Sequence, residues 1–185
     1  DFTLVPQYYV TLSGTINARG NVAVGAKSVG GGALLIDGTG DQAYTSHSSG
    51  TWPALNVAKP AGSFAPANLT DTTLVVRVST FTLANGTFVA PAGRLDILST
   101  ATTTFSYTNG TFTANGGKLR MANYHGNGGG AWHSTIYLRK PLTLRDLTYD
   151  GGNYYGSQNA YYTLDIAGEG RLVVECDVAM KYDDP

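Results

Sequence analysis

Apolar residues recur at every second position in several short segments of the chain, which is the spacing of a β-strand with one buried face. The clearest examples are RLDIL, KLRMA and RLVVEC, with the apolar pairs Leu95 and Ile97, Leu119 and Met121, and Leu172 and Val174. The polar residues between and beside them are expected to face water: Arg94, Asp96, Lys118, Arg120, Arg171 and Glu175. Apolar spacing of three and four is always interrupted by Gly or Pro, so the pattern predicts an all-β fold.

One stretch of the chain occurs in two similar copies. The stretch FTLANGTFVAPAGRL (Phe81–Leu95) is followed 24 residues later by FSYTNGTFTANGGKL (Phe105–Leu119), and eight of the fifteen positions are identical. Each copy contains Asn-Gly followed by Thr-Phe, and Asn-Gly favours backbone with a positive φ. The pair therefore predicts a bend, after which the Phe returns the chain to the interior. A glycine also precedes each alternating strand: Gly32, Gly93, Gly117 and Gly170.

A unit of this length cannot bury its own apolar face, so neighbouring copies are expected to stack. Two architectures fit: antiparallel hairpins that turn at Asn-Gly, or a parallel β-helix in which Asn-Gly marks a corner. Short segments and matching residue types favour the second, an all-β parallel β-helix (β-solenoid) of roughly seven coils with loop excursions. The stacked pairs are then expected to be Phe81 with Phe105, Phe88 with Phe112 and Leu95 with Leu119.

Three segments interrupt the repeat. The first, Thr51–Asp71, contains three prolines, and it is expected at a sheet edge or outside the sheet because proline lacks the ladder N–H. The other two, Asn123–Ser134 and Gly151–Tyr162, are rich in glycine or tyrosine and are expected to be loop excursions.

The first ten residues lie outside the repeat. They predict an N-terminal capping or exchange strand over residues 1–10, followed by a single β-solenoid domain over residues 11–185. Because solenoid ends are open sheet edges, this strand is expected either to close its own end or to add to a neighbouring copy and build a filament. Its candidate assembly residues are Phe2, Leu4, Val5, Tyr8 and Val10.

The order NGTFTANGGKLRM, STIYLRKPLTLRDLTYDGG and YTLDIAGEGRLVVECDVAM resembles the β-solenoid repeats of large bacterial surface and secreted proteins. Filamentous haemagglutinin and autotransporter passenger regions are similar in kind. There a G-x-L-x-[IV] strand is followed by a Thr/Ser-rich strand and an L-x-N/D-L-T strand, which LTLRDLT (Leu142–Thr148) matches. The resemblance spans most of the chain. It implies an extracellular or cell-surface, non-catalytic module: a stalk, an adhesin module or a filament subunit, whose partners are itself or flanking repeats of a longer chain.

Composition narrows the classes of partner and activity. Charged residues make up 14% of the chain and the net charge is -1, so no basic patch and no nucleic-acid partner are expected. No apolar run reaches the ~18 residues of a membrane helix, so no membrane insertion is expected. The acidic residues are scattered without paired spacing and G-x-S-x-G is absent, so the chain is expected not to be an enzyme. The single cysteine, Cys176, is expected to be buried on a strand.

Two cation sites were weighed from the residue types. The stretch DGTGD places Asp37 and Asp41 around two glycines, which suits calcium, but the same carboxylates also suit a turn that caps backbone N–H groups. Three histidines, His47, His125 and His133, lack the further ligands of a zinc site and are interpreted as surface residues. No other cofactor is expected.

Aromatic residues gather in the later part of the chain: Trp132, Tyr137, Tyr154, Tyr155, Tyr161 and Tyr162. Sugars stack on aromatic faces, so these residues support an alternative function, a carbohydrate-binding domain with a polysaccharide partner. The competing interpretation is that they seal one side of the solenoid or a subunit interface, where Tyr and Trp are enriched.

Overall fold

The computed structural model describes residues 1–5, 8, 10–27, 29–99, 102–123, 131–151 and 161–181. Within these residues the chain is all-β, with strands β1 to β20 and no helix. A helix of the length and hydropathy needed to cross a membrane is therefore absent from the described ranges.

The strands form two large and two small sheets. The largest has eleven strands. They are β1 (Phe2–Leu4), β3 (Thr15–Ala18), β4 (Val22–Val24), β6 (Ala33–Ile36), β7 (Gln42–Ser46), β8 (Ala54–Pro66), β10 (Thr80–Val89), β12 (Thr103–Tyr107), β13 (Thr111–Thr113), β15 (Ala131–Leu138) and β18 (Tyr161–Gly168). A five-stranded sheet contains β9 (Val75–Val78), β11 (Arg94–Ser99), β14 (Lys118–Asn123), β17 (Asp146–Asp150) and β20 (Val178–Lys181). Two separate pairs are β2 (Val10–Thr11) with β5 (Val29–Gly30), and β16 (Leu142–Leu144) with β19 (Leu172–Val174).

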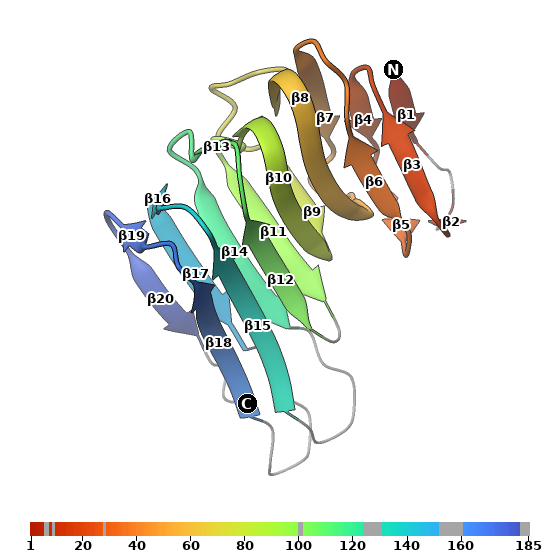
Figure 1. Cartoon of the computed structure of the whole chain (residues 1–185). Coiled ribbons are helices and arrows are strands. Elements are labelled where there is room, and N and C mark those ends of the chain that lie inside the picture. Colours follow the sequence, from red (N-terminus) through yellow and green to blue (C-terminus); the bar gives the residue numbers. More distant parts are fainter. Residues whose placement is uncertain are drawn as a thin grey trace.

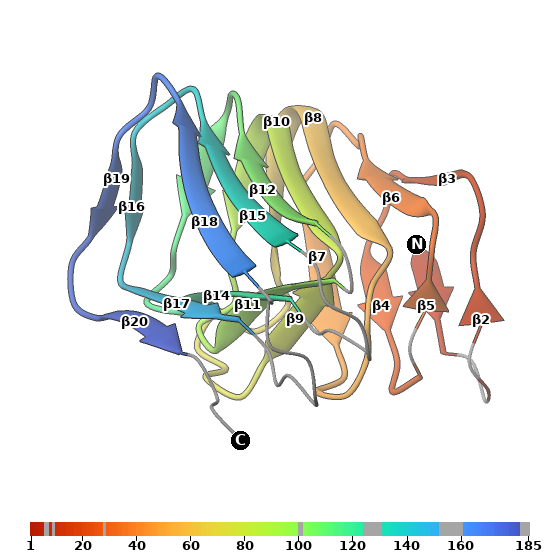
Figure 2. The same ribbon diagram turned by 90° about the horizontal axis from the view of Figure 1, so that it is seen from below.

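Every strand pairing within the described residues is parallel, which contradicts the hairpin alternative. The strands follow one another along the length of the molecule in sequence order, so β1 and β20 lie towards opposite ends (Figure 1). Seen from below, β8, β10, β12, β15 and β18 lie side by side on one face, and β9, β11, β14 and β17 lie along another (Figure 2).

The register between the two repeats is the one that the sequence predicts. Phe81 pairs with Phe105, and their rings lie 5.1 Å apart between centroids at an interplanar angle of 23°. Phe88 pairs with Phe112, with ring centroids 5.7 Å apart. Leu95 likewise pairs with Leu119. All three predicted stacks are confirmed.

Rows of apolar side chains run along the interior, one residue from each successive strand. In one row Leu34, Leu55, Phe81, Phe105 and Ile136 have no exposed surface, and the row continues to Ile166 on β18, which is 55% exposed. Full burial of one such side chain contributes about 1.5–3 kcal/mol relative to an exposed position. Equivalent positions on the paired strands are therefore occupied by apolar residues, because each row continues through the core.

The prediction for Thr51–Asp71 is wrong. Residues Ala54–Pro66 form β8, which lies inside the largest sheet and pairs with β6, β7 and β10. The prolines are tolerated because of where they lie along β8. Pro60 lies between Ala58 and Ser63, outside the register positions of the β8–β10 ladder, and Pro66 is the last residue of the strand.

Two other predictions of irregular structure are only partly tested. Asn123 lies in β14 and residues 131–134 lie in β15, so the ends of the first predicted loop are strands. Tyr161 and Tyr162 likewise lie in β18. Residues 124–130 and 152–160 lie outside the described residues. Cys176 is exposed, contrary to expectation, because it lies at the bend between β19 and β20 and not on a strand.

Candidate functional site

Charged side chains gather on the outward face of β9, β11, β14 and β17. Register places Arg77, Asp96, Arg120 and Thr148 in one row across these strands, and Arg94, Lys118 and Asp146 in a second. Asp150 lies two residues beyond Thr148 on the same face. We call the following residues the charged face: Arg77, Arg94, Asp96, Lys118, Arg120, Asp146 and Asp150.

Asp96 is the best-buried member of the charged face. Its side chain has 0% exposed surface, although the alternation of the strand predicted that it would face water. Arg94 Nε donates to Oδ1 at 2.5 Å and Arg94 Nη2 donates to Oδ2 at 2.9 Å, a bidentate pair. Arg77 Nε lies 3.4 Å from Oδ2. The prediction is wrong because two guanidinium groups, one on the same strand and one on the next, cover the carboxylate.

The other two carboxylates of the charged face are also covered by cations. Arg120 Nη2 lies 2.5 Å from Asp150 Oδ2. Lys118 Nζ lies 3.9 Å from Asp146 Oδ2, and Arg145 Nε lies 3.8 Å from the same atom. The carboxylates are buried, whereas the Lys118 side chain is 59% exposed. The face therefore presents basic groups to solvent above an acidic layer.

A hollow of about 230 Å³ opens on the charged face, lined by Arg94, Lys118, Arg120, Thr148 and Asp150. Its lining offers guanidinium, ammonium and hydroxyl donors, which suit a ligand with carboxylate or other anionic oxygens. Sequence analysis predicted no basic patch. The signal was present in the alternating strands, but their cations are far apart in sequence and only the parallel register brings them together.

A second polar cluster lies inside the molecule, around Lys59. The Lys59 side chain is fully buried. Its Nζ donates to the carbonyl oxygens of Gly38 and Gly40, each at 2.8 Å, and to Gln42 Oε1 at 2.5 Å. Burial lowers the pKa of Lys59, and the charges of Asp41 and Asp37 oppose this shift. The oxygen-rich DGTGD stretch thus holds a cation, but the cation is the ammonium of the chain itself.

The two aspartates of this stretch have protein partners. Asp37 Oδ1 lies 3.4 Å from Arg19 Nε. Asp41 Oδ1 accepts hydrogen bonds from the backbone N–H of Ser63 at 2.7 Å and from its hydroxyl at 2.9 Å. These two bonds hold the pKa of Asp41 below its ordinary value. Among the described residues no group of three or more His, Cys, Asp or Glu side chains could hold a metal ion, so Asp37 and Asp41 have no third carboxylate or imidazole beside them, and the calcium site stays a prediction.

The predicted aromatic platform is only partly within the described residues. Trp132 and Tyr162 are register partners in the β15–β18 ladder, and Ala131 pairs with Tyr161. Tyr137 is half-buried, its hydroxyl accepts a hydrogen bond from Arg139 Nε at 3.0 Å, and the Arg139 guanidinium lies 5.9 Å from its ring centroid. Tyr154 and Tyr155 lie outside the described residues. The platform stays a prediction.

Of the histidines, His47 and His133 each contact a hydroxyl. His47 Nδ1 lies 2.9 Å from Ser49 Oγ, and His133 Nδ1 lies 2.7 Å from Thr163 Oγ1. Both histidines are exposed, as expected for surface residues. His125 lies outside the described residues.

The N-terminal segment makes regular contacts within its own chain. β1 pairs in parallel with β4, Phe2 aligns with Val22, and Phe2 packs against the hydrophobic core. Val5 and Tyr8 are 66% and 78% exposed. The capping or exchange role of residues 1–10 stays a prediction, because the pairing with β4 leaves the other edge of β1 open to either role.

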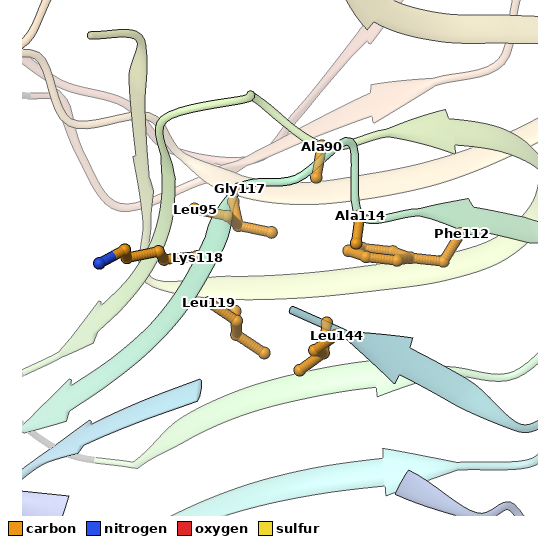
Figure 3. Close-up of a pocket in the computed structure, with 8 residues that line it drawn as sticks. All are labelled: Ala90, Leu95, Phe112, Ala114, Gly117, Lys118, Leu119 and Leu144. Atoms are coloured by element: carbon orange, nitrogen blue, oxygen red, sulfur yellow. The ribbon is translucent and has the colours of Figure 1, made fainter. Parts of the chain in front are cut away.

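A small pocket lies among Ala90, Leu95, Phe112, Ala114, Gly117, Lys118, Leu119 and Leu144 (Figure 3). Its volume of about 10 Å³ is room for about one water molecule. The cavity is a gap in packing and is too small for a substrate.

Comparison of the chain with protein-family models, with curated proteins and with solved structures gives no match. The candidate sites therefore rest on their own geometry.

Proposed function

We propose that the chain is a parallel β-solenoid with a structural, non-catalytic function: an extracellular subunit that adds end to end to second copies of itself. The parallel pairing of successive strands supports the solenoid. The resemblance to the repeats of bacterial surface proteins supports the location and the structural role. The specific claim is that the exposed edge at the last strand is covered by a second copy of the chain.

The observation that carries the proposal is the exposure of core rows at the last strand. Leu95, Leu119 and Leu147 are buried and lie in one row with Val178, which is 62% exposed. A neighbouring row behaves in the same way: Ile97, Met121 and Tyr149 are buried, and Met180 is 64% exposed. In the part of the chain that the structure describes, no strand covers Val178 or Met180, and exposed apolar side chains that continue a core row form a surface on which one more strand can add.

The first strands of the chain offer a matching edge. Val10 and Leu12 alternate with the polar residues Thr11 and Ser13, as Val178 and Met180 alternate with the small residue Ala179, and Val10 is exposed. Among the described residues, β2 pairs only with β5 and β20 pairs only with β17, so each has one open edge. Addition of β2 from a second copy to β20 continues the parallel sheet and extends both apolar rows.

The head-to-tail contact joins two different edges, that of β20 on one copy and that of β2 on the next. A contact between two different surfaces leaves one free end on each copy and generates open filaments.

The test blocks either the edge of β20 or the edge of β2 by a single substitution. Val178→Lys places a charge on the last strand, and Val10→Lys places one on the first. In sedimentation velocity and electron microscopy, the unmodified chain is expected to form polymers that grow with concentration, and each variant alone is expected to be monomeric. An equimolar mixture of the two variants retains one intact end from each and is expected to form dimers.

Leu69→Lys is the matched control, because Leu69 is 52% exposed but lies in the turn between β8 and β9, away from both ends. Its polymers are expected to be unchanged. An unmodified chain that stays monomeric at every concentration contradicts the proposal. Dimers of Val10→Lys alone indicate a tail-to-tail contact and contradict the head-to-tail arrangement.

A further inference from the structure

We propose that the charged face binds a linear acidic polysaccharide, a polymer of uronic acid residues, across the strands β9, β11 and β14. The juxtaposition that carries this is the presence of at least one basic side chain on each of three neighbouring parallel strands, each paired with a buried carboxylate. The inference concerns the outward face of one sheet and is independent of the stacking of its ends.

The cations are spaced by the architecture of the sheet. Arg77 lies on β9, Arg94 on β11, and Lys118 and Arg120 on β14. Neighbouring strands in a sheet lie about 4.8 Å apart, so a polymer that crosses the strands meets a new basic side chain at each step. The carboxylates of successive sugars can thus each contact a basic side chain on a successive strand.

The guanidinium groups are held in place before any ligand arrives. Asp96 accepts both donors of Arg94 and lies 3.4 Å from Arg77 Nε, and Asp150 accepts from Arg120. Side chains fixed in this way lose less conformational freedom on binding than free arginines do. Arg94 donates to Asp96 through Nε and one Nη2 N–H, which is two of the five N–H donors of its guanidinium.

The hollow between the strands is suited to a single anionic group with hydroxyl neighbours. Lys118 is the most exposed cation of the lining, and the Thr148 side chain lies at its edge. A carboxylate of a uronic acid matches the fork of a guanidinium and the point charge of an ammonium. The sugar hydroxyls match the hydroxyl of Thr148, which also lines the hollow.

Charge density favours a uronate polymer over a nucleic acid. The charged face has four basic and three acidic side chains, so its net charge is small. Nucleic acids carry a phosphate about every 3.4 Å of each strand and bind through dense positive charge or through aromatic stacking. The outward positions of β9, β11, β14 and β17 contain no aromatic residue. A polymer with one carboxylate per sugar fits this face better.

The test is affinity electrophoresis of the full chain in gels that contain polygalacturonate, with neutral dextran as the reference. The Val178→Lys background keeps the chain monomeric and removes any contribution from multivalency. We expect polygalacturonate to retard the chain and neutral dextran to leave its mobility unchanged. Lys118→Glu is expected to weaken the apparent Kd at least about tenfold, because an exposed ammonium that contacts the polymer is replaced by a repelling charge.

Lys27→Glu is the matched control, since it makes the same charge change at an exposed lysine that is not part of the charged face. Its affinity is expected to be unchanged. Absence of retardation, or an equal loss in both variants, overturns the proposal. Tighter binding to single-stranded DNA or to dextran sulfate than to polygalacturonate overturns the choice of a uronate polymer.

Discussion

The Nζ atom of Lys59 lies 2.5 Å from the Oε1 atom of Gln42, inside the molecule and on a neighbouring strand. Gln42 Nε2 in turn donates to the carbonyl oxygens of Ala18 at 3.1 Å and Gly20 at 2.5 Å. One polar chain therefore links three successive levels of the stack. Its donors satisfy carbonyl groups at or beside the ends of strands, where the ladder of a sheet leaves backbone oxygens without partners.

Lys59→Met is expected to destabilise the fold. The substitution keeps a long buried side chain but removes the donor, so that the carbonyls of Gly38 and Gly40 and the amide oxygen of Gln42 lose a partner. An unsatisfied buried polar group costs about 1–3 kcal/mol, so the expected loss in the free energy of unfolding is about 3 kcal/mol or more. Guanidinium chloride denaturation measures it.

The control for this experiment is Lys27→Met, which removes a lysine from the surface. Its effect on the free energy of unfolding is expected to stay within about 0.5 kcal/mol. Equal midpoints for Lys59→Met and the unmodified chain would show that the buried ammonium has no net role in stability.

Gly117 precedes β14 at a point where two levels of the chain come close. A Cβ atom at this position would overlap the carbonyl oxygen of Pro91, whereas a Cβ atom at Gly40 would meet nothing within 4 Å. Gly117→Ala is therefore expected to lower the free energy of unfolding by about 1–3 kcal/mol, the usual range for overpacking. Thermal unfolding of Gly117→Ala and Gly40→Ala is the test, and similar melting temperatures for the two variants would refute the close approach.

The rows of the core could be predicted because the two copies of the repeat have the same residue type at equivalent positions. Phe81 and Phe105 are identical in two aligned copies, and that identity is sufficient to predict the register. Period two also places Lys59 inward, since it follows Leu55 and Val57 at the same spacing in β8. That pattern is present in the sequence, but the three prolines of Thr51–Asp71 predicted a segment at a sheet edge or outside the sheet.

The charged face could not be predicted in the same way. Alternation assigns Asp96 to the outward side of β11 correctly, but the burial of its carboxylate depends on Arg77, which lies on another strand. The register between two strands determines which charged residues lie opposite one another. The pattern of residues within one strand does not predict these ion pairs. For the same reason, the exposed apolar ends of the rows became visible only when each row was followed to Val178 and Met180.

The pH dependence of stability should reveal Asp41. Hydrogen bonds from the backbone N–H and the hydroxyl of Ser63 hold the pKa of Asp41 below its ordinary value of 3.8 in the folded chain. The unfolded chain therefore binds the proton at a higher pH than the folded chain, and the carboxylate contributes stability above pH 3.8 that is lost as the pH falls through the lower folded pKa. Asp41→Asn removes this titration. We expect its melting temperature to lie below that of the unmodified chain at neutral pH and the difference to shrink as the pH falls below 3.8.

Asp37→Asn is the control, because Asp37 lies in the same stretch but pairs with Arg19 and not with Ser63. A difference for Asp41→Asn that stays constant from neutral to acidic pH would mean that the charge of the carboxylate adds nothing to its hydrogen bonds.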